Sequence, residues 1–185
     1  MVLAIRMYGA KSLRQKALRV ASITPVVRAL VDDMLATMRA NSGVGLAAEQ
    51  IGRREAVIVI DITGAERNGV RAEAENPHVA MPLVLVNPAI VSHEGTQDGP
   101  EGCLSFPDIF VTVRRAMKVT ATYTDLNGRA CSVTAQGLLS RAIQHELDHL
   151  HGVLLVDRMT QVQKLSLAGR LKRLKHEGAD ENAAA

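Results

Sequence analysis

The sequence predicts an α+β domain, with strands in the middle of the chain and helices before and after them. Two observations lead to this prediction. Strand-like apolar segments follow one another in the middle of the chain, and segments with helical periodicity lie on both sides of them. The 185 residues are 47% hydrophobic, enough for one core without cross-links. We assign residues 1–176 to a single domain and expect residues 177–185 to form a disordered tail.

The first helix is expected over residues 24–40. Thr24 can cap its start and Pro25 suits its first turn, whereas the segment 41–43, Asn-Ser-Gly, stops it. The apolar residues that recur at helical spacing on one face are Val27, Leu30, Val31, Met34, Leu35 and Met38. This face predicts packing against a core.

Four strands are expected after this helix. Residues 56–62 are rich in β-branched side chains and predict a buried strand, and residues 83–88 predict a second one. Residues 117–124 alternate apolar and polar side chains, as a half-buried strand does. A turn at 125–128 allows residues 129–135 to pair back as a hairpin.

The remaining segments are two loops and two helices. Residues 63–80 are polar and without periodicity, which predicts a surface loop or insertion, and residues 92–102 also resemble a loop. Helices are expected over 138–151 and over 160–176. The apolar stripe of the last helix consists of Val162, Leu165, Ala168, Leu171 and Leu174.

Composition excludes several classes of protein. A formal net charge of +3 and the near absence of aromatic side chains argue against DNA binding. Two cysteines do not make a disulfide framework at this length, which favours a reducing compartment. The sequence shows neither a signal peptide nor an apolar run of membrane-spanning length. We therefore expect a cytoplasmic protein without a membrane partner.

The segment QHELDHLHG, residues 144–152, carries the strongest chemical signal. His145 and His149 are four residues apart, so on a helix they share one face and can bind one metal ion. Glu146 lies beside the first histidine and is placed to act as a general base. A surface helix that happens to carry histidines is the alternative, but the apolar residues around the motif indicate a buried helix.

A catalytic metal site of this kind usually has a third protein ligand. His151 points away from the pair on a helix, and His176 lies in a basic helix end, so neither suits the role. Cys103 is a better candidate because a thiolate is a strong ligand for transition metals. From Cys103 alone, a metal ligand and a small buried hydrophobe are equally good interpretations. Cys131, in the predicted hairpin, is interpreted as structural.

Three segments taken together resemble the signature motifs of the peptide deformylases. They are GVGLAAEQ at 43–50, EGCLS at 101–105 and QHELDHLHG at 144–152, in the order of the family pattern. The resemblance implies a metal-dependent hydrolase that removes the formyl group from the N-terminal methionine of newly synthesised polypeptides and releases formate. It also implies that Cys103, His145 and His149 are the metal ligands and that Glu146 is the general base and acid. The implied fold is α+β, with antiparallel strands packed around a central metal-binding helix that carries the HExxH motif, and with an N-terminal and a C-terminal helix.

The resemblance extends to the rest of the site and to the partners. It implies that Gln50 and the backbone N–H of Leu104 form an oxyanion hole, and that Gly45 lies along the bound peptide. The implied metal is Fe²⁺, with Zn²⁺, Ni²⁺ or Co²⁺ able to replace it. The implied substrate is the nascent formyl-methionyl chain. A ribosome contact is implied for the basic last helix, for which a solvated basic face is the alternative; its basic residues are Lys164, Arg170, Lys172, Arg173 and Lys175.

Supporting residues are less well defined by the sequence. Asp148 is expected to pair with Arg114 or Arg115, and Glu101 to brace a ligand histidine or Gln50. Arg141 is given no role. The candidates for the wall and rim of a methionine pocket, chosen for their places beside the motifs, are Val44, Gly99, Pro100, Leu138 and Ala142.

Two rival functions remain open at this point. A binding module with a purely structural metal is disfavoured because Glu146 and Gln50 are both present. A metallopeptidase that cuts internal peptide bonds is disfavoured by the upstream Cys103, and neither rival explains the segment 43–50.

Overall fold

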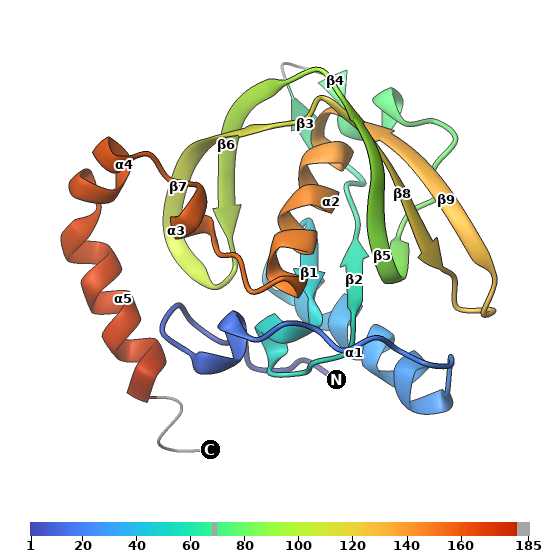
Figure 1. The fold of residues 1–185 in the computed structure, drawn as a ribbon, viewed down its shortest axis with the longest axis horizontal. Helices are drawn as coiled ribbons and strands as arrows, with labels where there is room; N and C mark the ends of the chain where they lie inside the picture. Colours follow the sequence, from blue (N-terminus) through green and yellow to red (C-terminus); the bar gives the residue numbers. More distant parts are fainter. Residues whose placement is uncertain (68–69, 181–185) are drawn as a thin grey trace.

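The computed structural model describes residues 1–67 and 70–180, which form antiparallel sheets and several helices (Figure 1). The largest sheet has the strand order β1-β2-β5-β8-β9, and every neighbouring pair in it is antiparallel. Its strands are β1 (Gly45–Ala47), β2 (Val57–Ile60), β5 (Leu83–Glu94), β8 (Lys118–Thr124) and β9 (Ala130–Gln136). Two hairpins complete the strands: β3 (Glu66–Arg67) with β4 (Val70–Arg71), and β6 (Gln97–Cys103) with β7 (Phe106–Arg115). The predicted α+β class is confirmed.

The helices lie before and after the strands in the sequence, as predicted. They are α1 (Pro25–Ala40), α2 (Gly137–Leu150), α3 (Leu155–Arg158), α4 (Gln161–Ser166) and α5 (Ala168–Asp180), with short 3-10 turns η1 (Lys11–Arg14), η2 (Ala48–Ile51) and η3 (Ala72–Glu75). The Oγ1 of Thr24 accepts a hydrogen bond from the N–H of Val27 at 3.4 Å, so the predicted cap of α1 is confirmed. No helix in the described ranges is long and apolar enough to cross a bilayer.

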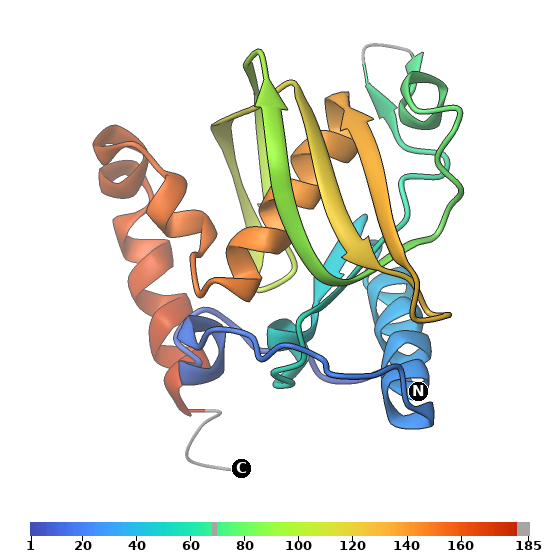
Figure 2. The same cartoon turned by 45° about the vertical axis from the view of Figure 1, so that its right-hand side comes forward.

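Helix α2 lies between the β6–β7 hairpin and the five-stranded sheet (Figures 1 and 2). Its apolar residues Leu139 and Ile143 are fully buried and pack with Ile58, Ile60 and Leu85 of the sheet. Because the other side of the helix faces the hairpin, side chains from α2 and from β6 meet in the interior. This arrangement places the QHELDHLHG segment at the contact between helix and hairpin.

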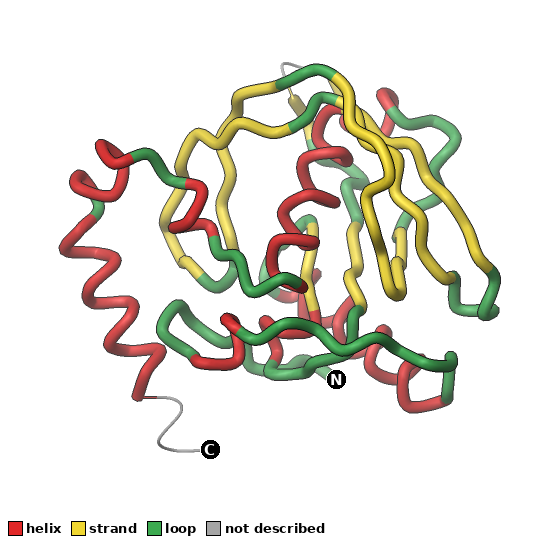
Figure 3. The backbone as a smooth tube through the Cα atoms, viewed as in Figure 1, coloured by secondary structure: helices red, strands yellow, loops and turns green. Residues whose placement is uncertain are grey.

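Most of residues 1–24 have no regular secondary structure, yet they connect the motif segments (Figure 3). The N–H of Arg6 donates to the carbonyl of Gln50 at 2.7 Å, and the N–H of Tyr8 donates to the carbonyl of Ser105 at 3.0 Å. The same segment contacts α5. A Cβ added at Gly9 would lie 2.1 Å from the Lys175 carbonyl oxygen, so only glycine allows this close approach.

The surface loop or insertion predicted at 63–80 is not irregular throughout, because eight of its sixteen described residues lie in regular elements. The segment contains the β3–β4 hairpin and the η3 turn, although residues 68–69 lie outside the described ranges. Ala72 is buried in the main core. The buried side chain of Asn76 bonds the backbone of Gln136 in both directions, at 2.9 and 3.2 Å, just before α2 begins. A polar side chain in this segment therefore satisfies backbone groups where α2 starts. Hydrophobic periodicity does not reveal a contact of this kind.

The prediction of a loop at 92–102 is also wrong. Strand β5 continues to Glu94, and β6 follows at once. Glycine and proline made this stretch resemble a loop. Among the described strands, however, β6 pairs only with β7, and an edge strand tolerates proline because one side needs no partner.

The last predicted helix, 160–176, divides into α4 and α5 at Leu167. Leu171 and Leu174 are buried as expected, whereas Val162 and Leu165 of the predicted apolar stripe are each 76% exposed. Helix α5 continues to Asp180, so residues 177–180 of the predicted tail are helical. Contact between α5 and the N-terminal segment at Gly178 accounts for this extension, since a Cβ there would meet the Tyr8 carbonyl at 2.5 Å. Residues 181–185 lie outside the described ranges.

Candidate active site

Three side chains of the kinds that can bind a metal ion converge where β6 ends against α2. One ligand atom each from Cys103, His145 and His149 lies within 4.8 Å of the other two. The Cys103 Sγ is 3.3 Å from the Nε2 of His149, and the two imidazole rings are 5.1 Å apart. Cys131 lies instead on β9 opposite Tyr123. One thiol and two imidazoles at this spacing fit a transition metal with a further position open to water or substrate.

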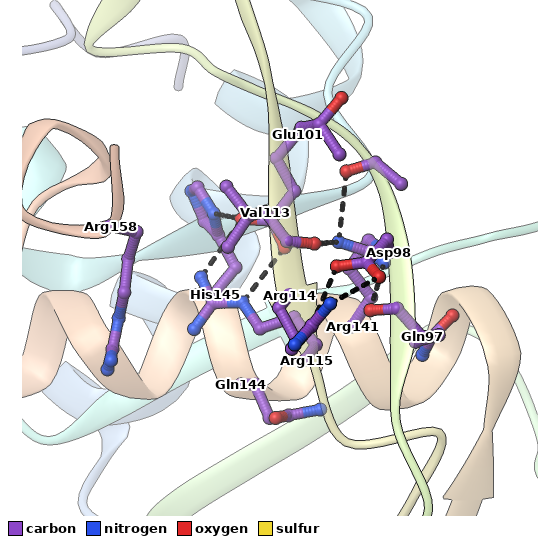
Figure 4. Close-up of polar contacts among 12 residues, drawn as sticks. Gln97, Asp98, Glu101, Val113, Arg114, Arg115, Arg141, Gln144, His145 and Arg158 are labelled. Atoms are coloured by element: carbon purple, nitrogen blue, oxygen red, sulfur yellow. Dashed lines mark hydrogen bonds and ion pairs between the residues drawn. The ribbon is translucent and has the colours of Figure 1, made fainter. Parts of the chain in front are cut away.

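Glu101 braces this cluster from strand β6 (Figure 4). Its Oε2 lies 3.0 Å from the Nδ1 of His145, and both its oxygens accept hydrogen bonds from Arg115 at 2.9 Å. Although burial acts to raise it, the hydrogen bonds from Arg115 and His145 hold the pKa of Glu101 well below its usual range. An ionised carboxylate only accepts, so the Nδ1 of His145 carries a proton, and Nε2 is the nitrogen that can present a lone pair to the cluster once it is deprotonated. Of its two expected partners, a motif histidine or Gln50, Glu101 contacts the histidine, His145.

The charge network extends along α2 to Asp148. The Nη1 of Arg115 donates to Asp148 at 2.6 Å, so the predicted pair is the one with Arg115. Arg158 makes a second, two-point ion pair with Asp148. Arg114 pairs instead with Asp98 in solvent, at 3.1 Å. Arg115 therefore joins a carboxylate of β6 to a carboxylate of α2.

Arg141 has a structural role that sequence reasoning missed. Its side chain is buried and donates to Glu101 at 2.8 Å and to the carbonyl of Val113 at 3.0 Å. It also reaches the carbonyls of Gly99 and Gln97 at 3.3 and 3.4 Å (Figure 4). Arg141 thus fixes both strands of the β6–β7 hairpin to the helix that carries the histidines. The only sequence signal was its position one turn before His145.

The two histidines differ in their electrostatic surroundings. Burial, together with the positive charges of His145 and Arg115, lowers the pKa of His149 well below its usual value. Burial also acts to lower the pKa of His145, but the nearby Cys103 and Glu101 raise it well above its usual value. Both imidazoles must be neutral to bind a metal, so metal binding has to displace a proton from His145.

Glu146 lies beside the cluster with a free carboxylate oxygen. The side chain is 4% exposed, and among the described residues its Oε2 has no hydrogen-bond partner. Burial raises the pKa of Glu146 to about 7. A carboxyl group with a pKa near neutral pH can both accept and return a proton. Gly45 leaves room for it, because a Cβ at that position would lie 2.4 Å from the Glu146 Oε1.

Gln50 presents its amide N–H₂ group to the cluster. Its Oε1 accepts from the N–H of Ala47 at 2.9 Å, which fixes the orientation of the amide. The Nε2 then lies 3.5 Å from the Cys103 Sγ and 3.3 Å from the Oγ of Ser105. Ser105 is fully buried, and sequence reasoning gave it no role. Leu104 occupies the turn between β6 and β7, directly after Cys103.

A cavity of about 620 Å³ opens onto these groups. Val44, Gly45, Pro100, Leu138 and Ala142 line it, and their contact with a substrate stays a prediction. Gly99 packs against Arg141 instead. Sequence reasoning missed a second apolar wall, which consists of Ile5, Met7, Phe106, Pro107, Ile109 and Phe110. The apolar run FPDIF directly after EGCLS was the available signal.

A half-buried cysteine with two buried histidines, a carboxyl group with a free oxygen and an apolar cavity together define a metal-dependent hydrolase site on an α+β scaffold. The sequence pattern of the polypeptide deformylase family matches residues 2–165. Peptide deformylase from Endomicrobium trichonymphae is 39% identical, with 95% of this chain and 97% of the relative covered. Peptide deformylase 2 from Gloeobacter violaceus is 45% identical, with 91% and 84% covered.

Solved structures agree with these sequence matches. Peptide deformylase 1B from Arabidopsis thaliana, in complex with an inhibitor, superimposes with a TM-score of 0.85 at 32% identity, covering 98% of this chain and 94% of the other. The enzyme from Legionella pneumophila gives 0.81 at 35% identity, covering 97% and 98%. The chain belongs to the polypeptide deformylase family. It is a hydrolase that removes the N-formyl group from newly synthesised polypeptides.

Proposed function

We propose that Cys103, His145 and His149 hold one divalent metal ion, which makes α2 the central metal-binding helix of the domain. The surrounding residues use this ion to hydrolyse the formyl amide of N-formylmethionyl chains. The convergence of three ligand atoms within 4.8 Å of one another carries this proposal. When bound, such an ion supplies a nucleophile at neutral pH, because it lowers the pKa of water from near 16 towards about 7.

Glu146 is the proposed general base and acid. Its position next to His145 and its free Oε2 support acceptance of a proton from the attacking water. Its pKa near neutrality supports the return of that proton to the leaving amine, which becomes the N-terminus of the polypeptide. Burial of the carboxyl group favours both steps, because bulk water cannot exchange the proton freely.

Gln50 and the N–H of Leu104 are the proposed oxyanion hole. The bond between Ala47 and the Gln50 Oε1 keeps the Nε2 side facing Cys103, where the oxygen of the tetrahedral intermediate would develop its charge. Leu104 follows Cys103 directly, so its backbone amide is close to the same point. Two donors that are already oriented stabilise that charge without reorganisation.

The substrate backbone is proposed to lie along Gly45, and Val44 to contact its side chains. Within residues 1–67 and 70–180, β1 is an edge strand that pairs only with β2, which leaves its other edge available for an extended peptide. Leu138 and Ala142 give the cavity the apolar surface that a methionine side chain requires.

The proposed native metal is Fe²⁺, with Zn²⁺, Ni²⁺ or Co²⁺ able to occupy the same ligands. A thiolate ligand that binds iron is vulnerable to oxygen and peroxide, so we expect the iron form to lose activity in air. Reconstitution of the metal-free protein with each ion, followed by assay with and without oxygen, tests the choice.

The protein is proposed to act in the cytoplasm and to contact ribosomes through the basic residues of α5. Lys172, Arg173 and Lys175 are all exposed, whereas Arg170 already bonds the carbonyl of Asp108 at 2.8 Å. Salt-dependent co-sedimentation with ribosomes that is lost in a Lys172→Glu, Arg173→Glu variant would support the contact. Equal sedimentation of the two proteins would contradict it.

The decisive experiment measures formate release from a formyl-Met peptide under anaerobic conditions, after loading with ferrous iron. Wild type should release formate, and Glu146→Ala should be slower by orders of magnitude with one metal still bound per chain. No formate from folded, metal-loaded wild type would refute the assigned reaction. Full activity in Glu146→Ala would refute only the role of that residue.

A further inference from the structure

We propose that Ser105 is a positioning residue, which holds the side-chain amide of Gln50 in the orientation in which that amide acts on the substrate. The proposal rests on the proposed function, because it takes Gln50 to be an oxyanion donor. It concerns the residue that aims this donor, and neither the donor itself nor the metal ligands.

The amide of Gln50 is held at both of its ends. Its Oε1 accepts a hydrogen bond from the N–H of Ala47 at 2.9 Å, and its Nε2 donates to the Oγ of Ser105 at 3.3 Å. An amide nitrogen carries two hydrogens. Ser105 takes one of them, and the other is left for the side of Cys103, whose Sγ lies 3.5 Å from the Nε2 and is a weak acceptor. The bond to Ser105 therefore leaves one N–H to face the developing oxyanion.

The bond from Ala47 does not fix the amide by itself. It decides which end of the amide carries the nitrogen, because a backbone N–H needs an oxygen to accept it. The amide can still turn about this one hydrogen bond, and a second bond at the Nε2 removes that freedom. Among the residues that the structure describes, the Oγ of Ser105 is the one oxygen that accepts from the Nε2. The orienting role therefore falls on Ser105.

Ser105 has a position that suits this role. It lies in the turn between β6 and β7, two residues after Cys103, and is 0% exposed. A buried hydroxyl group needs a hydrogen-bond partner, and Gln50 supplies it. Because the contact is shielded from bulk water, solvent does not readily replace Ser105 as the acceptor.

The N-terminal segment fixes the distance between Gln50 and Ser105. The N–H of Arg6 donates to the carbonyl of Gln50 at 2.7 Å, and the N–H of Tyr8 donates to the carbonyl of Ser105 at 3.0 Å. The ring of Tyr8 also stacks on Phe106, the residue after Ser105, at 4.7 Å between ring centroids. Since both donors belong to one short stretch of backbone, they hold the two residues at a separation that lets their side chains meet.

The orientation of Gln50 matters for the rate because oxyanion stabilisation requires a donor that is aimed before the charge develops. An amide that turns freely spends part of its time away from the oxyanion, which lowers kcat. Ser105 is not among the described residues that line the cavity, so KM should stay unchanged. The loss of one neutral hydrogen bond predicts a fall in kcat of about three- to tenfold.

The test is a double-mutant cycle on kcat, with formate release from a formyl-Met peptide as the assay. Ser105→Ala should lower kcat by about three- to tenfold at unchanged KM and metal content. In a Gln50→Ala background the same substitution should have no further effect, because no amide remains to be aimed. Ser105→Thr keeps the hydroxyl group and should retain most of kcat.

Ser140→Ala is the matched control. Ser140 is also 0% exposed, and its Oγ also accepts from a glutamine, the Nε2 of Gln144 at 3.1 Å. It lies on α2 and does not contact Gln50 through this bond. Any effect of Ser140→Ala on kcat should therefore be the same factor with and without Gln50.

A second readout needs neither activity nor metal. In the ¹⁵N-labelled, metal-free protein, the side-chain amide signal of Gln50 is the one that disappears in Gln50→Ala. Ser105→Ala should shift this signal, whereas Ser140→Ala should shift the signal of Gln144 instead. An unmoved Gln50 signal in folded Ser105→Ala would overturn the proposal even if kcat fell.

The cycle separates this inference from the proposed function. An equal loss of kcat from Ser105→Ala in both backgrounds, or equal losses in Ser105→Ala and Ser105→Thr, would overturn the role of Ser105 and leave Gln50 as the donor. Normal kcat in Gln50→Ala would overturn the oxyanion role of Gln50 and this inference with it. Absence of formate from folded, metal-loaded wild type would overturn the assigned reaction.

Discussion

Replacing Glu101 with glutamine should destabilise the protein and loosen its metal site in a single step. The Oε1 of Glu101 accepts from Arg115 and Arg141, and the Oε2 accepts from Arg115 and His145. Glutamine has the same shape but only one oxygen. Whichever way its amide turns, an N–H₂ group would face two donors, and two buried guanidinium groups would lose their shared carboxylate.

The magnitude follows from this geometry. Removing one partner of a buried ion pair typically costs about 3–5 kcal/mol, and the remaining glutamine oxygen can still accept two hydrogen bonds. Asp148 also remains as a partner for Arg115. We therefore expect a loss near the lower end, about 3 kcal/mol. Since His145 would lose the acceptor that orients it, metal affinity should fall by about 10–100-fold.

The assay is urea unfolding of the metal-free proteins, combined with a chelator competition for the metal. Asp98→Asn is the matched control, because Asp98 lies on the same strand and pairs with Arg114 in the same two-point manner, but in solvent. It should leave both the unfolding midpoint and the metal affinity unchanged. If Glu101→Gln lost no more stability than Asp98→Asn, the hydrogen bonds and ion pairs of Glu101 would not stabilise the fold.

Three further predictions concern residues around the cluster. Burial raises the pKa of Glu49 from 4.5 to about 8, so the stability that neutral Glu49 contributes is full below about pH 4.5 and is lost as the pH rises through 8. The loss in unfolding free energy should be at most about 1.4 kcal/mol per pH unit. Glu49→Gln should remove this loss, which is measured as the difference between urea midpoints at about pH 5 and pH 9. Gly45→Ala would press on the Glu146 carboxylate and should lower kcat up to about a hundredfold. Gly169→Ala is the control, because open space surrounds that position, and its kcat should not change. Equal kcat values for the two variants would contradict the close contact between Gly45 and Glu146. Gln50→Ala should lower kcat by about 10²–10³-fold with metal content unchanged, and a purely structural role would instead appear as lost stability at normal kcat.

The metal cluster was predictable because its spacing is local. His145 and His149 share a helix face whatever the rest of the chain does, and the apolar flanks indicated that the helix is buried. Cys103 was a candidate from the chemistry of thiolates and from its motif, but no local pattern places it near the histidines. The α+β class and the boundaries of α1 were likewise available from periodicity and capping.

Other features depend on contacts between distant segments. β6 was missed because Gly99 and Pro100 are typical of loops. Its strand conformation depends on pairing with β7 and on the contact with Arg141. The exposure of Val162 and Leu165 depends on a break at Leu167, which the apolar stripe does not reveal. The direction of Phe110 depends on a bulge of β7 at Asp108, a backbone feature held by an arginine 62 residues away in sequence.

The geometry of the site also relates two of its motifs to each other. Residues two apart on a strand lie on the same face, separated by about 6.6 Å, and residues four apart on a helix are separated by about 6 Å along its axis. Glu101 and Cys103 are such a strand pair, and His145 and His149 are such a helix pair. When β6 lies along α2, the match places Glu101 against His145 at 3.0 Å and Cys103 against His149 at 3.3 Å. One docking of strand on helix therefore creates the ligand set and the brace of its first histidine together. Inserting one residue between Glu101 and Cys103 would turn one of the two side chains to the opposite face and separate brace from ligand.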